Sequence, residues 1–493
     1  MVALLVALFS FITLAVFLLR RRSAPRKMLP PSPRKLPIIG NLHQLGAHPH
    51  RSLQSLSMRY GQLMLLHFGN TPVLVASSAA AAREIMKNQD FIFSNRPKLS
   101  IPDRLIYGSR DVAFSRYGDY WRQMRSICVL QLLSNKRVQS FRRVRQEETS
   151  LMVEKIELLG RSSTVVNLSD ELVALTNNVI CRVALGRKYV GEENRFKKIL
   201  LEFLELFGTS PVRDYIPWLA WIDRVNGLDA KVERVAKLFD EFLEDVVRDH
   251  RDREKLDDDA ELDFVDILLQ FQRENKNTFP VEDEAIKALV TDMFVAGTDT
   301  THSAIEWTMA ELIRNPRSMK TLQNEVREVV GRKGEIDEED LEKMKYLKAV
   351  IKESLRLHPP IPLLVPREST QDTKVLGYDV ISGTRVAINA WMISRDPSIW
   401  ENPNEFRPER FLDTSIDLKG LHFEFVPFGA GRRGCPGIAF AVAVNELGIA
   451  KLVHKFNFAL PNEGREEDLD MTEANGSATN KKLPLLVVIQ KYC

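Results

Sequence analysis

Apolar residues recur at intervals of three and four along most of the chain between residues 115 and 357, which is the spacing of one buried helix face. This pattern predicts helices at Glu147–Leu159, Leu228–Arg251, Glu282–Arg314 and Arg317–Val330, with stops at Asn315-Pro316 and Gly331. Short strand-like runs flank the helical block at Leu63–Phe68, Val73–Ala76 and Arg385–Ala390. No repeat or low-complexity stretch divides the chain. We therefore predict one large domain that is mainly α with a minor β portion.

The N-terminus carries a different pattern, an apolar run from Val2 to Leu19 that is interrupted only by Ser10 and Thr13 and is followed at once by Arg20–Arg22. As a helix this run would reach roughly 27 Å, close to the thickness of the core of an endoplasmic reticulum bilayer. The alternative is a cleaved signal peptide, but no basic residue precedes the run and its apolar core exceeds the usual ~7–15 residues. We predict a transmembrane anchor at residues 1–22 in the endoplasmic reticulum membrane, with the domain facing the cytoplasm because arginines remain on that side.

Residues 23–40 form a basic, proline-rich segment, and the prolines at 30, 31, 33 and 37 exclude a helix and stiffen the chain. We predict a hinge here and the folded domain at residues 41–493. Residues 1–35 contain seven basic and no acidic residues, so the remainder has 62 basic and 66 acidic residues and a net charge of about −4. A body without basic excess gives no reason to expect a nucleic-acid partner.

The cysteines are scattered and form no C-x-x-C pair, which argues against a disulfide framework or a structural zinc site; they are Cys128, Cys181, Cys435 and Cys493. An isolated cysteine is most often a small buried hydrophobe. Cys435 differs because its loop contains glycines at 429, 431, 434 and 437. Neighbouring Arg432 and Arg433, and the N-terminus of a predicted helix at Ile438–His454, would stabilise a thiolate there.

The spacing Phe428-x-x-Gly431-x-Arg433-x-Cys435-x-Gly437 resembles the haem-binding signature of the cytochrome P-450 superfamily at every fixed position. This resemblance implies the cytochrome P-450 fold, a single large haem domain, with haem b (iron protoporphyrin IX) as cofactor. It makes Cys435 the axial ligand of the haem iron. It also implies that Phe428 packs near the sulfur and that Arg433 pairs with a haem propionate.

Two further motifs resemble the same family. Glu353-Ser-Leu-Arg356 and the later Arg410 match its Glu-Arg-Arg triad, a structural network that secures the cysteine loop. Alone, an acid and a base three residues apart are most often a solvated surface pair.

Trp121-Arg-Gln-Met-Arg125 resembles the helix that binds a propionate, and Arg367 is expected to join Trp121 and Arg125 there. Guanidinium groups suit carboxylates because they donate two parallel hydrogen bonds. Without the cysteine loop, a core tryptophan beside a surface arginine would be the simpler interpretation.

The long predicted helix contains Ala296-Gly-Thr-Asp299-Thr300-Thr, although glycine and threonine lower helix stability. One interpretation is a kink with threonine hydroxyls bonded back to the preceding turn. The other is the family's acid–alcohol pair, Asp299 and Thr300, which relays protons while dioxygen is activated. We predict the second as the catalytic role of these two residues.

The chain further resembles plant microsomal enzymes of specialised metabolism, especially monoterpene oxidases of the menthofuran synthase type, over a scaffold stretch at residues 63–90. The residues expected to line the substrate pocket are Ala296, Ala304, Leu363, Leu364, Val365 and Ser477. Residues 361–365 are apolar, as a terpenoid or an aromatic substrate requires, whereas residues 475–478 are small and polar and favour a substrate with a carbonyl or hydroxyl group.

The predicted function is a haem-thiolate monooxygenase that inserts one atom of O2 into a small lipophilic plant metabolite. A terpenoid, and among terpenoids a monoterpenoid, is favoured; a phenylpropanoid or coumarin-type aromatic is the alternative. Electrons would come from NADPH through NADPH–cytochrome P-450 reductase, with cytochrome b5 as a second donor and membrane lipid around the anchor. A hydroperoxide-rearranging enzyme of this fold, or a membrane haem-binding protein without turnover, would have no use for an acid–alcohol pair.

Two other polar clusters lie outside these motifs. The basic run from Lys136 to Arg145 is a solvated face or, in this family, part of the surface that meets an acidic reductase. His43, His48 and His50 lie in a loop without neighbouring carboxylates, so no metal site is predicted there.

Overall fold

The computed structural model describes residues 27–162, 165–188, 193–253, 262–276, 279–474 and 476–492. The predicted anchor at residues 1–22 lies outside these residues. Across the described part of the chain, no helix combines the length and the apolar character that crossing a membrane requires.

The described residues are mainly helical, with the strands confined to small sheets. The helices before the centre of the chain are α2 (Pro49–Tyr60), α3 (Ala79–Arg83), α4 (Ser100–Leu105), α5 (Asp119–Ile127), α6 (Asn135–Ser140), α7 (Arg142–Ser162), α8 (Leu168–Leu185), α9 (Glu193–Phe207), α10 (Trp221–Val225), α11 (Leu228–Asp252) and α12 (Phe264–Glu274). They are followed by α13 (Asp283–Arg314), α14 (Pro316–Val330), α15 (Glu338–Leu341), α16 (Lys345–Leu357), α17 (Ala390–Ile393) and α18 (Ile438–Lys455). The prediction of a mainly α fold with a minor β portion is confirmed.

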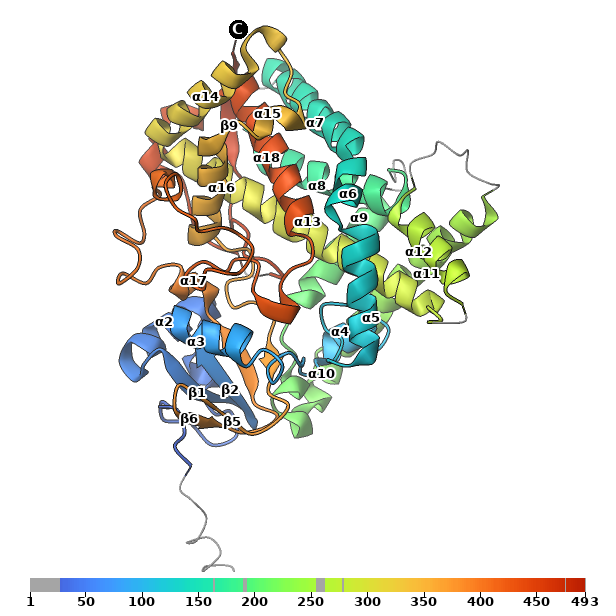
Figure 1. Ribbon diagram of the computed structural model, residues 1–493, viewed down its shortest axis with the longest axis vertical. Coiled ribbons are helices and arrows are strands. Elements are labelled where there is room, and N and C mark those ends of the chain that lie inside the picture. The colour runs from blue at the N-terminus through green and yellow to red at the C-terminus, as the bar shows by residue number, and fades with distance from the viewer. Residues whose placement is uncertain are drawn as a thin grey trace, which may run out of the picture.

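Helix α13 is the centre of the helical part and crosses it diagonally behind α18 (Figure 1). It packs against α8, α16 and α18, and most of its residues are buried. Gly297 permits the close approach of α8, because a Cβ at this position would lie 2.5 Å from Cδ1 of Ile180. The glycine that lowers the intrinsic stability of α13 therefore lets a neighbouring helix pack against it.

The principal sheet has the strand order β1-β2-β7-β4 and lies with α2 and α3 at the lower left of Figure 1. Its strands are β1 (Leu63–Phe68), β2 (Thr71–Ala76), β4 (Arg367–Glu368) and β7 (Arg385–Ile388). β1 and β2 form an antiparallel hairpin, while β7 runs parallel to β2. The smaller sheets contain β3 (Val166–Asn167), β8 (Phe456–Ala459) and β9 (Leu486–Lys491), and separately β5 (Thr373–Val375) and β6 (Tyr378–Val380).

The predicted element positions agree closely with the structure. The long helix begins at Asp283 rather than Glu282, since Glu282 is its N-cap, and it ends at Arg314 before Pro316 as expected. Three elements differ by more than one residue: α7 is longer than the predicted Glu147–Leu159 at both ends, and β2 begins at Thr71 rather than Val73. β7 stops at Ile388 rather than Ala390, because the Asn389 side chain caps α17 and Ala390 begins that helix.

The described part of the proline-rich segment lies against the domain. Pro31 accepts a hydrogen bond from the backbone of Leu65 at 2.9 Å, and Gly40 pairs with Leu36 and with Phe68. These contacts join the segment to β1 both in its middle, at Pro31, and at its last residue, Gly40.

Candidate active site

The cysteine loop turns tightly between the core and α18. Its backbone N–H at Cys435 donates to the carbonyl oxygen of Phe428 at 2.9 Å, which closes the turn. Gly429 and Gly431 have φ values of 67° and 68°, a region that favours glycine. At Gly431 a Cβ would lie 2.3 Å from the carbonyl oxygen of Met86, so no larger residue fits.

The thiol of Cys435 is enclosed by protein but keeps accessible surface. Burial raises its pKa, whereas the N–H of Gly437, 3.3 Å from Sγ, and the charge of Arg125 act in the opposite direction. Cys128 is a contrast: it is wholly buried, and burial raises the pKa of its thiol to about 12, so it is inert. Of the cysteines in the described residues, only Cys435 combines accessibility with a donor directed at sulfur.

Beside this loop, four guanidinium groups are gathered: Arg96, Arg125, Arg367 and Arg433. Arg125 donates to the carbonyl of Gly434 at 2.6 Å. Arg367 donates to the carbonyl of Ala430 at 2.7 Å and to Asp90 at 3.1 Å. Burial, and after it the charge of Arg367, lowers the pKa of Arg433 to about 9.

Trp121 and Arg433 lie together, as the sequence motifs required, but both contact protein backbone. The Arg433 guanidinium lies 4.0 Å from the centre of the Trp121 ring and donates to the carbonyls of Ser94, Val112 and Ser115. The indole N–H also donates to Val112, at 3.0 Å. One carbonyl thus orients both side chains.

Sequence reasoning missed two members of this site. Arg96 donates to the carbonyls of Ala113, Val365 and Pro366, and Asp90 receives the backbone N–H of Arg432 as well as two guanidinium groups. Neither residue belongs to a recognisable motif, and their contacts reach across up to 342 positions. No local signal marks them.

This arrangement fits a haem. Among the described residues, Arg367 pairs with Asp90, whereas Arg96, Arg125 and Arg433 form no ion pair, which leaves positive charge in excess. Burial, and after it the repulsion between the guanidinium groups, lowers the pKa of Arg433 and Arg96. Two propionates would balance that excess through charge-assisted hydrogen bonds. The accessible thiol of Cys435 is the donor that a thiolate-ligated iron requires.

The predicted triad is assembled and buried. Glu353 receives two hydrogen bonds from Arg356, at 2.7 and 2.8 Å, and one from Arg410 at 2.9 Å. The side chains of Glu353 and Arg356 are 0% exposed. The remaining donors of Arg356 contact the carbonyls of Ser394, Pro403 and Glu405.

Aromatic contacts connect this network with the cysteine loop. The Arg356 guanidinium lies over Trp400, and the rings of Trp400, Phe411 and Phe425 follow one another at centroid distances of 5.7 and 5.1 Å. Phe425 is fully buried and lies ten residues before Cys435. The triad therefore fixes the segment from which the loop emerges.

The middle of α13 carries the threonines for which the sequence offers two interpretations. The hydroxyl of Thr300 donates to the carbonyl of Ala296 at 2.5 Å, which is the predicted bond to the preceding turn. Ala296 is exposed and Thr300 half-buried, although the helix is buried on both sides of them. The accessible stretch of α13 is therefore the one that carries the alcohol of the predicted acid–alcohol pair.

Asp299 is held by the C-terminal segment. Oδ2 accepts from the hydroxyl of Ser477 and from the N–H of Ala478, and Oδ1 accepts from Asn480 at 2.9 Å. Ser477, predicted as a pocket residue, thus supports the carboxylate. Asn475 of the same predicted segment lies outside the described residues.

The other predicted pocket residues lie partly in the core. Leu363 packs on the hydrophobic cluster of β1 and β2, and Leu364 packs on the cluster beneath the sheet, close to Gly429. Leu364 has a φ of 53°, which is a strained conformation for leucine. Val365 is half-buried, and Ala304 is buried in the main core.

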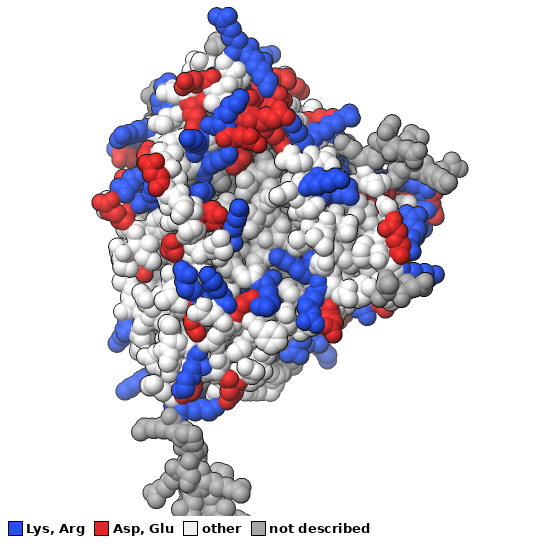
Figure 2. All heavy atoms as spheres, in the orientation of Figure 1, with Lys and Arg blue, Asp and Glu red and all other residues white. Residues whose placement is uncertain are grey.

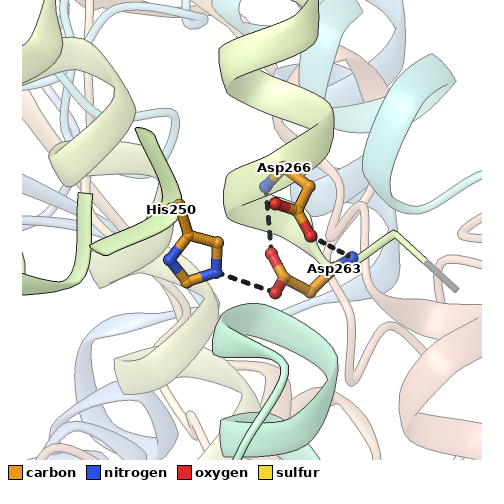
Figure 3. Close-up of side chains that lie close together, drawn as sticks. All are labelled: His250, Asp263 and Asp266. Carbon is orange, nitrogen blue, oxygen red and sulfur yellow. Dashed lines mark hydrogen bonds and ion pairs between the residues drawn. The ribbon is translucent and has the colours of Figure 1, made fainter. Parts of the chain in front are cut away.

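One group of possible metal ligands exists within the described residues: His250, Asp263 and Asp266 (Figure 3). Its atoms are already used, since His250 contacts the carbonyl of Val246 and Asp263, while the two aspartates cap the start of α12. The guanidinium of Arg253 lies 3.7 Å from Asp263. A capping box beside a histidine, rather than a metal site, explains the cluster.

The basic run divides into exposed and buried residues. Lys136 is exposed, but Arg145 is fully buried and forms two hydrogen bonds with Glu338. Figure 2 shows basic side chains over the lower middle of the face that carries α5 and α18, whereas acidic side chains gather above, near α15. Only part of the predicted run is therefore available to a partner.

A family model described as Cytochrome P450 matches residues 30–488. The chain is 62% identical to "Cytochrome P450 71A6" of Nepeta racemosa, over 98% of each chain, and 61% identical to "(+)-menthofuran synthase" of Mentha piperita, over 97% of each. It is 55% identical to "Norfluorocurarine oxidase" of a Strychnos species, over 98% of this chain and 97% of that one. A solved zebra fish cytochrome P450 with progesterone has a TM-score of 0.77 at 27% identity, covering 91% of this chain and 100% of that one.

Proposed function

This chain belongs to the cytochrome P450 family of monooxygenases, and from that premise we propose that it oxidises a small lipophilic plant terpenoid, with a monoterpenoid favoured. The observation that carries the proposal is its similarity to (+)-menthofuran synthase, which extends over almost the whole of both chains. The apolar side chains of residues 361–365 support a hydrocarbon-rich substrate.

Cys435 would hold the iron of haem b, and the haem would supply dioxygen activation when bound. The N–H of Gly437 and the charge of Arg125 favour the thiolate form of the ligand. Arg125, Arg367 and Arg433, with Trp121 beside them, would hold the propionates. Phe428 would pack near the sulfur, because its carbonyl is bonded to the N–H of Cys435.

Asp299 and Thr300 would deliver protons. The Thr300 hydroxyl now donates to Ala296, and turning it away from that carbonyl would present its proton to the accessible side of α13. Asp299 precedes Thr300 in the same turn of α13, and hydrogen bonds from Ser477 and Asn480 hold its carboxylate in place.

Electrons would come from NADPH through a reductase that carries acidic residues, with cytochrome b5 as a second donor. Exposed basic residues near α5 and α6 would meet it, among them Lys136. The apolar residues 1–22 would anchor the enzyme in the endoplasmic reticulum membrane, with residues 23–40 as hinge and residues 41–493 facing the cytoplasm.

The test uses microsomes that contain the full chain and a plant reductase. The reduced carbon monoxide complex should have the absorption typical of thiolate ligation, and Cys435→Ser should lose it; a histidine-type spectrum in the wild type would contradict the ligand. Binding spectra and turnover should then be compared for monoterpenes, sesquiterpenes and coumarins. Turnover of coumarins alone would contradict the terpenoid proposal.

Thr300→Ala provides the test of proton delivery. It should lower the amount of product formed per NADPH consumed, because the hydroxyl that directs proton delivery is removed and part of the NADPH is then consumed without oxidation of the substrate. Thr321→Ala is the matched control, because Thr321 is exposed on α14 and its hydroxyl also bonds back to the preceding turn. An unchanged product yield in Thr300→Ala would contradict the role.

A further inference from the structure

The backbone of residues 111–115 runs between a pair of buried carboxyl groups and the arginine cluster. On one side, the N–H of Val112 donates to Oδ2 of Asp292 at 2.7 Å, and the N–H of Phe114 donates to Oδ2 of Asp111 at 2.8 Å. On the other side, three carbonyls of the segment accept from the cluster: Val112 from Trp121 and Arg433, Ala113 from Arg96, and Ser115 from Arg433. The segment is therefore hydrogen-bonded to both groups, so a shift of the carboxyl pair would move the carbonyl groups that bind the arginines.

The carboxyl groups of Asp111 and Asp292 lie close enough to interact, and Asp111 is 0% and Asp292 7% exposed. Two adjacent buried carboxylates do not both ionise at neutral pH. Burial and the charge of Asp111 raise the pKa of Asp292 well above its ordinary value. Oδ1 of Asp111 is buried and accepts no hydrogen bond from a described residue, so a proton on the neighbouring Asp292 would give it a donor.

The surroundings decide which of the two carries the charge. Burial raises the pKa of Asp111, but the backbone N–H of Phe114 and the charge of Arg96 oppose that rise, and the charge of Asp111 in turn opposes the fall in the pKa of Arg433. The titratable groups near Asp292, apart from Asp111, are Tyr120 and Cys128, both neutral at pH 7. The negative charge therefore resides on Asp111, facing the arginines, and the proton on Asp292, facing α5.

We propose that Asp111 and Asp292 form a proton-sharing pair that positions residues 111–115, and through them Arg433 and Trp121, for the propionates of the haem. Both are positioning residues, since they act through the backbone of the segment. The inference rests on the haem site proposed above.

The experiment measures the rate at which the haem-loaded protein in detergent transfers haem to apomyoglobin, from pH 6 to pH 10. In the wild type the rate should rise with pH as the second carboxyl ionises and the pair repels. Asp292→Asn keeps an acceptor for Val112 and a donor for Asp111, so it should release haem at the wild-type rate near pH 6 and lose the rise. Asp111→Asn should also lose the rise, because only one carboxyl remains.

Asp292→Leu removes the acceptor for Val112 and should release haem about tenfold faster at every pH. Asp223→Asn is the matched control, since Asp223 is also buried and accepts the backbone N–H groups of Val212 and Arg213, and its guanidinium partner is Arg213 rather than a member of the arginine cluster; it should keep the wild-type pH profile. A rate that does not vary with pH in the wild type, or a rise that persists in both asparagine variants, would overturn the shared proton. Wild-type release from Asp292→Leu would overturn the positioning role, whereas a wild type that binds no haem would overturn the proposed function itself.

Discussion

Two buried networks built on arginines differ in how many of their guanidinium groups contact a carboxylate directly. In the first, Arg356 and Arg410 both pair with Glu353, and their other donors contact backbone carbonyls. In the second, four guanidinium groups lie around the cysteine loop, and Arg367 is the one of the four that forms an ion pair among the described residues, with Asp90. Every arginine of the first network therefore has a carboxylate partner in the protein, whereas Arg96, Arg125 and Arg433 contact backbone carbonyls.

The difference has a physical consequence. A buried charge is costly unless it is paired and hydrogen-bonded, so a closed network serves the fold and an unbalanced one indicates a ligand of opposite charge. Arginine abundance alone does not distinguish the two cases, since both are rich in guanidinium–carbonyl bonds. The number of guanidinium groups that contact a carboxylate directly does: both in the first network, and one of four in the second.

The largest effect is expected from opening the closed network with Glu353→Gln. Two buried guanidiniums would lose their counter-charge, and the free energy of unfolding should fall by about 3–5 kcal/mol. Urea unfolding with and without haem should give the same loss, because the haem does not compensate this site. The control is Glu401→Gln, an exposed partner of Arg407, for which the loss should stay below about 1 kcal/mol. A loss confined to the haem-loaded form would contradict the distinction.

In the unbalanced network, Arg125→Gln should act on the ligand instead of the fold. Haem release should become about 10- to 100-fold faster, the equivalent of a charge-assisted hydrogen bond. The stability of the haem-free protein should be unchanged or slightly higher, because one buried positive charge is removed. Arg122→Gln on the same helix is the control: Arg122 is exposed and pairs with Asp119. A large loss of stability without haem would show that Arg125 serves the fold.

A third network, also closed, gives a pH-dependent test. Glu473 is buried and accepts hydrogen bonds from His50 and Arg51, each at 3.0 Å, which holds its pKa at about 2. Because this pKa is depressed, the stabilisation is complete above the ordinary value of 4.5 and is lost as the pH falls from there toward 2. Glu473→Gln should therefore cost about 1–3 kcal/mol at pH 7 and flatten the acid limb of the stability curve. The exposed Glu467→Gln should change neither, and an unaltered acid limb in Glu473→Gln would refute the assignment.

The smallest effect is expected at Asp299, which keeps two of its three donors in Ser477→Ala. The free energy of unfolding should fall by about 1 kcal/mol. Ser398→Ala removes a similar bond to Asp396 on the surface and should have almost no effect. Equal losses of unfolding free energy in the two variants would mean that burial does not strengthen the hydrogen bond from Ser477 to Asp299.

Much of the fold and part of the site could be predicted from the sequence because their signals are local. The strand Leu63–Phe68 has the predicted bounds and the long helix ends at Arg314 as predicted, since the apolar period and a proline act within a few residues. The cysteine loop was predicted for the same reason: its glycines and Cys435 lie within ten positions. His50 shows the limit of local signals. No carboxylate lies near it in the sequence, and its partner Glu473 is 423 positions away.

The sequence by itself determined the helical architecture, the family, and Cys435 as the candidate ligand, all through short-range spacing. Only the tertiary structure decided which charges are balanced. In the folded chain Arg96 and Asp90 lie beside the cysteine loop, and Asp292 lies beside Asp111. The hydroxyl of Ser477 donates to the carboxylate of Asp299. Whether a buried charge is satisfied depends on all groups within a few ångströms, and in a folded chain those groups come from segments that no local pattern relates.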